Sequence, residues 1–89
     1  MTSEQARRDI VAGLHKAAGV LYEQRFASRL EDANQDICFA ELELDSLSTI
    51  AALVEITEET GVEIDLGDLA LHPSVNSLAE FVASRAGAR

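Results

Sequence analysis

The chain has 89 residues, of which 47% are hydrophobic, and a net charge of -9. This length predicts one small domain with a single core, spanning residues 1–89, because two domains need a longer chain. A single cysteine, Cys38, excludes an internal disulfide framework and is typical of a reducing compartment. No stretch approaches a membrane span or a secretory leader, so we expect a cytoplasmic protein without membrane attachment.

The charges are distributed unevenly along the chain. All seven Lys and Arg residues lie in 1–29 or 85–89, so residues 30–84 carry thirteen Asp and Glu and no Lys or Arg. Such a surface repels the phosphates of nucleic acids and anionic lipids, and it attracts basic protein surfaces. We therefore expect protein partners and no nucleic acid. An acidic composition that only aids solubility is the alternative interpretation.

The first predicted helix covers residues 1–18. Thr2 or Ser3 is suited to cap it. Apolar residues follow at helical spacing: Ala6, Ile10, Leu14, Ala17 and Leu21. The pattern is irregular over 19–44, which predicts a long loop, and loops of this length are often functional.

The clearest predicted helix covers residues 45–60. It begins at Asp45 or Ser46 and ends before Gly61, a residue suited to the left-handed position after a helix. A helical wheel places one apolar stripe toward the core: Thr49, Ala52, Leu53, Ile56 and Thr60. A second stripe lies on roughly the opposite side, with Glu58 beside it: Leu47, Ile50, Ala51 and Val54. One small domain can hardly bury both stripes, so we expect the second to face a partner or to pack under the long loop.

A short helix is predicted over 66–71 and a last helix over 76–86. Ser74, Asn76 or Ser77 is suited to cap the last helix. The predicted fold is therefore all-α: a small antiparallel bundle of three main helices and one short helix, with a long loop between the first two main helices. No internal repeat is present.

Enzymatic chemistry finds no support in the sequence. A nucleophilic serine needs a base, but the only histidines, His15 and His72, lie far along the chain from Ser46, and no G-x-S-x-G motif surrounds it. One cysteine and two distant histidines offer no zinc site. We therefore expect neither catalysis by this chain nor a bound metal.

One stretch imitates part of a calcium-binding loop. Asp32, Asn34 and Asp36 take the first, third and fifth positions, and Glu43 takes the twelfth. The sixth position holds Ile37, where the loop needs the sharp turn of glycine. There is also no second loop to pair with it, so calcium binding is a weak alternative.

Ser46 has two interpretations. Asp and Ser are the commonest residues at helix starts, so "DS" alone indicates a cap. However, a hydroxyl at the first turn also lies beside unpaired N–H groups, where a phosphate is favoured electrostatically. Capping does not explain Leu47 or the second apolar stripe, which fit a surface that recognises partners around a modified serine.

Two stretches resemble the acyl carrier protein family, over about residues 36–84. The first, "FAELELDSLSTIAALVEITEETGVEI", is similar to the pattern in which a Leu-Gly-Leu-type run precedes Asp-Ser-Leu and a helix follows. The second, "HPSVNSLAEFV", is similar to the final helix of carrier domains, with Pro-Ser before an apolar residue and then a Leu-Ala pair. The Asp-Ser-Leu core is short, but both flanks are in register with it.

The resemblance implies that Ser46 carries 4′-phosphopantetheine, installed from coenzyme A by a phosphopantetheinyl transferase. It implies that Asp45 and Leu47 help the transferase to recognise the site. It also implies a partner interface on the helix after Ser46: Leu47, Ile50, Ala51, Val54 and Glu58. Five further residues become core: Leu53, Ile56, Ile64, Leu78 and Phe81. The chain would then be a monomeric carrier of thioester-bound intermediates, and its partners would be enzymes with basic docking surfaces, such as ketosynthases, acyltransferases or adenylating-type loading enzymes.

Several residues depart from the family pattern. Glu43 stands where glycine is usual. Ala51 and Thr57 stand where fatty-acid carriers often have Glu, which favours docking by apolar burial and a polyketide or related pathway over ordinary fatty-acid synthesis. Thr60 replaces a common large apolar residue, which predicts a less filled interior there or compensation elsewhere. An aminoacyl or peptidyl carrier and a small helical interaction module with an unmodified serine are the alternatives.

Overall fold

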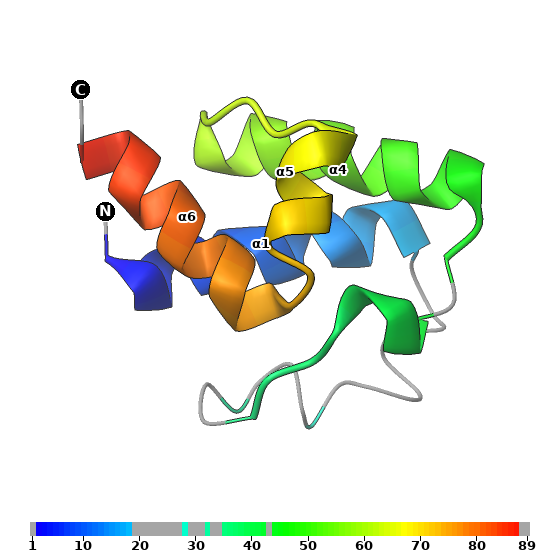
Figure 1. The fold of residues 1–89 in the computed structure, drawn as a ribbon, viewed down its shortest axis with the longest axis horizontal. Helices are drawn as coiled ribbons and strands as arrows, with labels where there is room; N and C mark the ends of the chain where they lie inside the picture. The colour runs from blue at the N-terminus through cyan, green and yellow to red at the C-terminus, as the bar shows by residue number, and fades with distance from the viewer. Residues whose placement is uncertain (1, 19–27, 29–31, 33–34, 43, 88–89) are drawn as a thin grey trace.

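The computed structural model describes residues 2–18, 28, 32, 35–42 and 44–87 (Figure 1). The helices among these residues are α1 (Ser3–Ala18), α4 (Ser46–Thr60), α5 (Leu66–Leu71) and α6 (Val75–Gly87), together with the 3-10 helix η1 (Phe39–Leu42). The all-α class with three main helices and one short helix is confirmed. In Figure 1, α1 and α4 run antiparallel and α6 crosses beside α1. None of the described helices has the length and hydropathy that a bilayer span requires.

The packing of α1 against α4 depends on a small residue, Gly13. A Cβ atom added there would lie 2.8 Å from the backbone N of Ile56. The two helix backbones therefore approach closely at a position where only glycine fits. Ile10 and Leu14, which were predicted to face inward, are at most 1% exposed. Leu21, the last residue of that predicted stripe, lies outside the described residues.

The inward stripe of α4 forms the centre of the core. Ala52, Leu53, Ile56 and Thr60 are buried, as predicted, and Thr49 is half-buried. The core is completed by residues from the other described segments: Ala6, Ile37, Leu42, Val62, Ile64, Val75, Leu78, Ala79 and Val82. The prediction that Leu53, Ile56, Ile64 and Leu78 belong to the core is confirmed.

The end of α4 is formed by Thr60 and Gly61. Gly61 adopts the left-handed conformation, with φ 71° and ψ 8°, and its N–H donates to the carbonyl of Thr57 at 2.8 Å. The hydroxyl of the buried Thr60 donates to the carbonyl of Ile56 at 2.8 Å and accepts from the N–H of Val62 at 3.2 Å. These local hydrogen bonds satisfy the hydroxyl of Thr60 inside the core, and the expected effect of its small size on the packing there stays a prediction.

A buried arginine, Arg7, ties the described part of the long loop to α1 and α6. Its side chain is 6% exposed, and its Nε donates to Oδ1 of Asn76 at 2.8 Å. Nη2 donates to the carbonyls of Asp32 and Gln35 at 3.1 Å and 3.0 Å. A buried charge is tolerated only when it is hydrogen-bonded in this way. This contact was not predicted from the sequence.

Asp36 attaches the same loop to the start of α6. Its Oδ1 accepts from the N–H groups of Ile37 and Asn76, both at 2.9 Å. Partial burial alone would raise the pKa of Asp36, but the N–H of Asn76, the Ser74 hydroxyl, the N–H of Ile37 and the charge of Arg7 together hold it below the usual value. The carboxylate therefore has a structural role at the α6 terminus.

The loop then pairs with the segment before α6 through one isolated antiparallel bridge between Cys38 and Ser74. The N–H of Phe39 donates to the carbonyl of Pro73 at 2.8 Å, and the N–H of Val75 donates to the carbonyl of Ile37 at 2.9 Å. This pairing positions η1, which the sequence analysis had predicted as plain loop.

The last helix begins where Ser74 caps it, since the Ser74 hydroxyl accepts from the N–H of Ser77 at 3.1 Å. Phe81, predicted as core, is only half-buried. Its ring stacks against His72, with centroids 4.7 Å apart, and the Arg85 guanidinium lies 5.2 Å from its centroid. Phe81 therefore covers the outside of the core instead of filling it.

Candidate functional site

The helix start at Asp45 and Ser46 is built by Asp45. Asp45 is the N-cap of α4, and its Oδ1 accepts from the N–H of Ser48 at 2.7 Å. Its carbonyl accepts from both the N–H and the hydroxyl of Thr49, at 2.9 Å and 2.8 Å. These bonds satisfy donors of the first turn that would otherwise be unpaired. Capping is therefore performed by the residue before Ser46.

Ser46 is the first residue of α4, and it is exposed. No described residue hydrogen-bonds to its hydroxyl. The hydroxyl thus has no part in the local structure among these residues. The sequence left open whether Asp45 or Ser46 caps the helix, and the structure assigns the cap to Asp45.

The electrostatics at this point are set by the Asp45 carboxylate. The pKa of Asp45 is held below its usual value, first by the N–H of Ser48 and then by the Ser48 hydroxyl, with a smaller effect of the N–H of Leu47. The negative carboxylate already offsets the positive end of the helix dipole. A phosphate on Ser46 would therefore lie close to both the positive end of the helix dipole and the negative Asp45 carboxylate.

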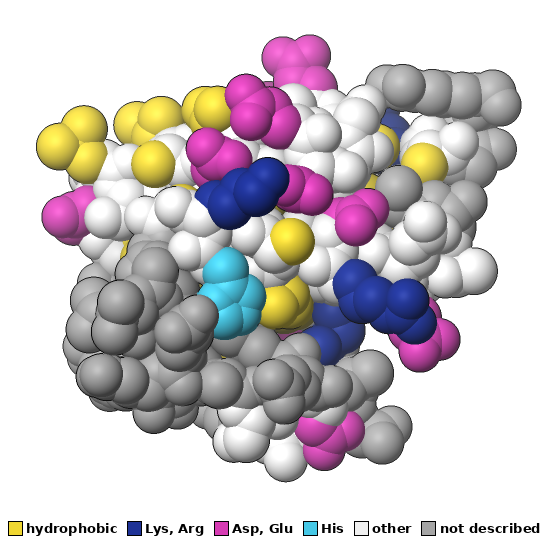
Figure 2. Space-filling view, turned by 180° about the vertical axis from the view of Figure 1, so that it is seen from behind, with side chains coloured by type: hydrophobic (Ala, Val, Ile, Leu, Met, Phe, Trp, Pro, Cys, Tyr) yellow, Lys and Arg dark blue, Asp and Glu magenta, His cyan; other side chains and the backbone are white. Residues whose placement is uncertain are grey.

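The second apolar stripe of α4 is exposed. Leu47 is 80% exposed, Ile50 49% and Val54 52%. Ala51 and Glu58 are exposed as well. Figure 2 shows hydrophobic side chains along the edge of the molecule that α4 forms, with acidic side chains beside them. All five residues that the resemblance placed at a partner interface are thus accessible on one helix.

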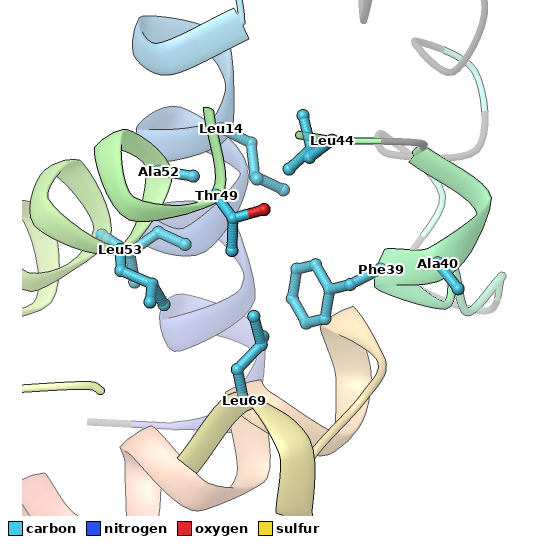
Figure 3. A pocket seen from close by; sticks show the side chains of 9 residues that line it. Leu14, Phe39, Ala40, Leu44, Thr49, Ala52, Leu53 and Leu69 are labelled. Carbon is cyan, nitrogen blue, oxygen red and sulfur yellow. The ribbon is translucent and has the colours of Figure 1, made fainter. Parts of the chain in front are cut away.

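An apolar pocket of about 100 Å³ lies beside the first turn of α4 (Figure 3). Phe39 from η1, Leu69 from α5 and Thr49 from α4 point toward the same space in this view. The other lining residues come from α1, η1, α4 and the stretch before α4: Leu14, Ala40, Leu44, Ala52, Leu53 and Ile56. Thr49 follows Ser46 by three residues, nearly one helical turn. Thr49 is therefore the pocket residue of α4 that is nearest to the serine along the chain.

This pocket was not predicted from the sequence. A less filled interior was expected only near Thr60, at the opposite end of α4, and Thr60 does not line the pocket. The available signal was the apolar residues Phe39 and Leu44 ahead of the Asp-Ser-Leu run. Their partner Leu69 lies 30 residues further along the chain, so only the fold brings them together.

The other candidate side chains serve structural contacts. His72 lies between α5 and α6, where its Nδ1 is 3.2 Å from the Ser77 hydroxyl. In the part of the chain that the structure describes, no three His, Cys, Asp or Glu residues group as metal ligands. Of the calcium-like loop, Asp36 binds the start of α6 and Ile37 is fully buried. Asn34 and Glu43 lie outside the described residues.

Comparison with known proteins identifies a family. The chain from 23 to 82 matches the family model described as "Phosphopantetheine attachment site". No curated protein and no solved structure matches the chain significantly. The matched family consists of carrier domains, which hold 4′-phosphopantetheine covalently and are not themselves enzymes. Because the match covers more than half of its length, the chain belongs to the phosphopantetheine attachment-site family.

Proposed function

We propose that Ser46 is the attachment residue and that the chain delivers acyl intermediates to partner enzymes in polyketide or related specialised biosynthesis. One observation carries this assignment: in a chain of this family, Asp45 performs the capping and leaves the Ser46 hydroxyl exposed at the first position of α4. An accessible hydroxyl is what a transferase needs to form the phosphodiester. When bound, the arm supplies a terminal thiol that holds the cargo as a thioester.

The residues around Ser46 divide the remaining work. Asp45 fixes the position of Ser46 at the helix start, and Leu47, 80% exposed, offers an apolar contact directly beside it. Ile50, Ala51 and Val54 continue this contact along α4. Exposed apolar side chains of this kind are uncommon as a contiguous stripe unless they are covered by a partner. Their exposure supports the proposed interface.

The charge distribution supports partners with basic surfaces. Glu58 lies beside the stripe, and residues 30–84 contain no Lys or Arg. Carrier domains interact with phosphopantetheinyl transferases and with biosynthetic enzymes. Long-range attraction accelerates encounter, and weak contacts allow rapid exchange between successive enzymes such as ketosynthases, acyltransferases and loading enzymes. We propose that the protein acts as a monomer in the cytoplasm. Its single cysteine favours this reducing compartment.

The apolar pocket favours acyl over aminoacyl cargo. Among the described residues that line it, Thr49 has the one polar side chain, so none of them offers a carboxylate to an ammonium group. Burying an unpaired charge is costly, whereas burying methylene groups is favourable. The volume is about 100 Å³, so the pocket fits only a short segment of chain.

The test of attachment is the intact mass of the protein after incubation with coenzyme A, magnesium and a broad-specificity phosphopantetheinyl transferase. The wild type should gain one phosphopantetheinyl group and Ser46→Ala none. Ser48→Ala, two residues away on the same turn, is the matched control and should be modified. No addition to the folded wild type would support the alternative of a helical interaction module and would exclude the carrier.

Cargo class is tested on the modified protein. We expect loading from acyl donors, such as malonyl or short acyl thioesters, when these are supplied with acyltransferases. Efficient loading by an adenylating enzyme with an amino acid, and none by acyltransferases, would support the aminoacyl or peptidyl alternative.

A further inference from the structure

Three glutamates lie together in the second half of α4: Glu55, Glu58 and Glu59. Glu55 and Glu59 are four residues apart, so they lie on one face of the helix, and both are half-buried. Glu58 is exposed and lies beside the second apolar stripe. This part of α4 therefore offers three negative charges to a basic surface that would dock on the stripe.

A cation from another helix, Lys16, already interacts with these glutamates. Lys16 is the only lysine of the chain and lies in the last turn of α1. Its ammonium forms an ion pair with Oε1 of Glu59. The pKa of Lys16 is raised, first by this hydrogen bond and by the charge of Glu59, and further by the charges of Glu55 and Glu58, which together outweigh partial desolvation. The ammonium therefore interacts with all three carboxylates.

The other described cations have different partners. Arg7 is buried against the long loop, and Nη2 of Arg8 lies 3.5 Å from Oε1 of Glu4 within α1. The Arg85 guanidinium lies over an aromatic ring of its own helix. Among the residues that the structure describes, Lys16 is therefore the cation that pairs with a carboxylate of α4.

The ion pair between Lys16 and Glu59 contributes little to the fold. The Lys16 side chain is 57% exposed, and exposed pairs of this kind stabilise proteins only weakly. Buried apolar side chains, among them Leu14 and Ile56, and the close approach at Gly13 hold α1 and α4 together instead. Lys16 can therefore leave Glu59 without opening the core, and its main effect is on the charge that a partner meets.

The position of this ion pair separates docking from chemistry. Glu59 follows Ser46 by 13 residues, which is about 20 Å along the helix axis at about 1.5 Å per residue. Physiological salt screens charges beyond about 8 Å, so Lys16 has little effect on the reaction at Ser46 itself. By contrast, a basic side chain of a partner that binds Glu59 must first displace Lys16, and the freed ammonium repels it.

We propose that Lys16 is an internal competitor of partner enzymes: it holds Glu59, weakens the docking of basic surfaces on α4 and thereby speeds the release of partners. The inference rests on the proposed function, in which such enzymes dock on this helix. It gives α1 a role that the proposed interface did not include. A carrier that serves several enzymes in turn needs weak docking, because a tightly held partner blocks the next one.

The proposal is tested by the KM and kcat of a phosphopantetheinyl transferase with a basic docking surface, with the unmodified protein as its substrate. Lys16→Met keeps the apolar stem of the side chain and removes its charge. It should lower KM about threefold at low NaCl, within the range of one exposed ion pair, and leave kcat unchanged. The difference in KM should shrink at high NaCl, because mobile ions screen the charges. Lys16→Gln should behave in the same way.

Arg8→Met is the matched control. It removes the same charge from the same helix, but Arg8 pairs with Glu4 and not with α4. The KM of this variant should stay within about 1.5-fold of the wild type. An equal fall of KM in Lys16→Met and Arg8→Met would show that only the net charge matters, and it would overturn the proposal.

A double-mutant cycle locates the competition at Glu59. Glu59→Gln removes the carboxylate for which Lys16 and the partner compete, so it should raise KM at low NaCl. In the Glu59→Gln background, Lys16→Met should lower KM by less than about twofold, because coupled residues are not additive. The same threefold fall in both backgrounds would contradict competition for this carboxylate. Circular dichroism and thermal melting verify that each variant is folded.

The outcomes separate this proposal from the proposed function. If Lys16→Met has the same KM as the wild type while Ser46 is modified normally, Lys16 is not a competitor and the carrier function stands. If the wild type is not modified even at saturating transferase, the proposed function itself fails, and the role of Lys16 fails with it.

Discussion

The Asp45 carboxylate accepts a hydrogen bond from the backbone N–H of Ser48 at 2.7 Å, across the residue proposed to carry the arm. In the Asp-Ser pair, Asp45 therefore has the structural role of the helix cap, and Ser46 is left for the proposed chemical role. Asp45→Ala should lower the melting temperature, because the first-turn donors of α4 lose their acceptor. Asp45→Asn should retain part of the stability, since asparagine also caps helices.

Ser46→Ala should leave the free energy of unfolding within about 0.5 kcal/mol of the wild type, because it removes an exposed hydroxyl without a described partner. Urea denaturation followed by circular dichroism measures the free energy of unfolding of Ser46→Ala and of Asp45→Ala. An equal destabilisation by Ser46→Ala and Asp45→Ala would show that the serine shares in the cap.

Acid stability depends on two carboxylates, Asp36 and Asp45, whose pKa values are both lower than the usual 3.8. Their stabilising effect is present above that value and is lost as the pH falls through the lower pKa of the folded state. Unfolding free energy should therefore fall between about pH 5 and about pH 2. Asp36→Asn should be less stable at neutral pH and should lose less stability over this range, with Glu80→Gln as the control. A pH profile identical to that of the wild type would contradict the role of Asp36.

Gly13 tests the close approach of α1 and α4. In an exposed helix interior, Gly→Ala stabilises by about 1 kcal/mol. Here the added Cβ would lie 2.8 Å from both the backbone N and Cγ1 of Ile56, so Gly13→Ala should destabilise by about 1–3 kcal/mol. The sign of the change in urea denaturation decides between the two effects. A stabilised variant would show that the helices do not touch at this point.

Arg7 and Arg8 form a matched pair of neighbours with different surroundings. Arg7 is buried and bonds Asn76 and two loop carbonyls, whereas Arg8 is exposed and its Nη2 lies 3.5 Å from Oε1 of Glu4. Arg7→Gln should cost about 2–4 kcal/mol of unfolding free energy, because it leaves buried acceptors without their donor. Arg8→Gln should cost less than about 0.5 kcal/mol. Similar effects of the two changes would contradict the anchoring role of Arg7.

The sequence was most informative where structure follows from local pattern. The 3.6-residue period separated Leu53 and Ile56, which are buried, from Leu47 and Val54, which are exposed. A glycine after an apolar run located the end of α4 at Gly61, because few other residues adopt a positive φ. The family resemblance directed attention to Ser46, and the family itself is confirmed by the match over 23–82.

The features missed from the sequence depend on contacts between distant residues. The burial of Arg7 was not predicted, since nothing near it in the chain reveals its partner Asn76, 69 residues away. Phe39 and Leu69 meet at the pocket only because the loop pairs with the segment before α6. Asp36 fitted a calcium-like spacing, but its carboxylate serves the start of α6. Long-range contacts of this kind have no signature in a single sequence.

The most direct test of the central claim is to locate the phosphopantetheinyl group within the modified protein. Cleavage after Glu43 and Glu55 releases residues 44–55, which contain Ser46, Ser48 and Thr49 as the only hydroxyl residues. Fragmentation of this peptide by mass spectrometry should place the entire addition on Ser46. An addition on Ser48, on Thr49 or on any other peptide would contradict the assignment of Ser46 as the attachment residue.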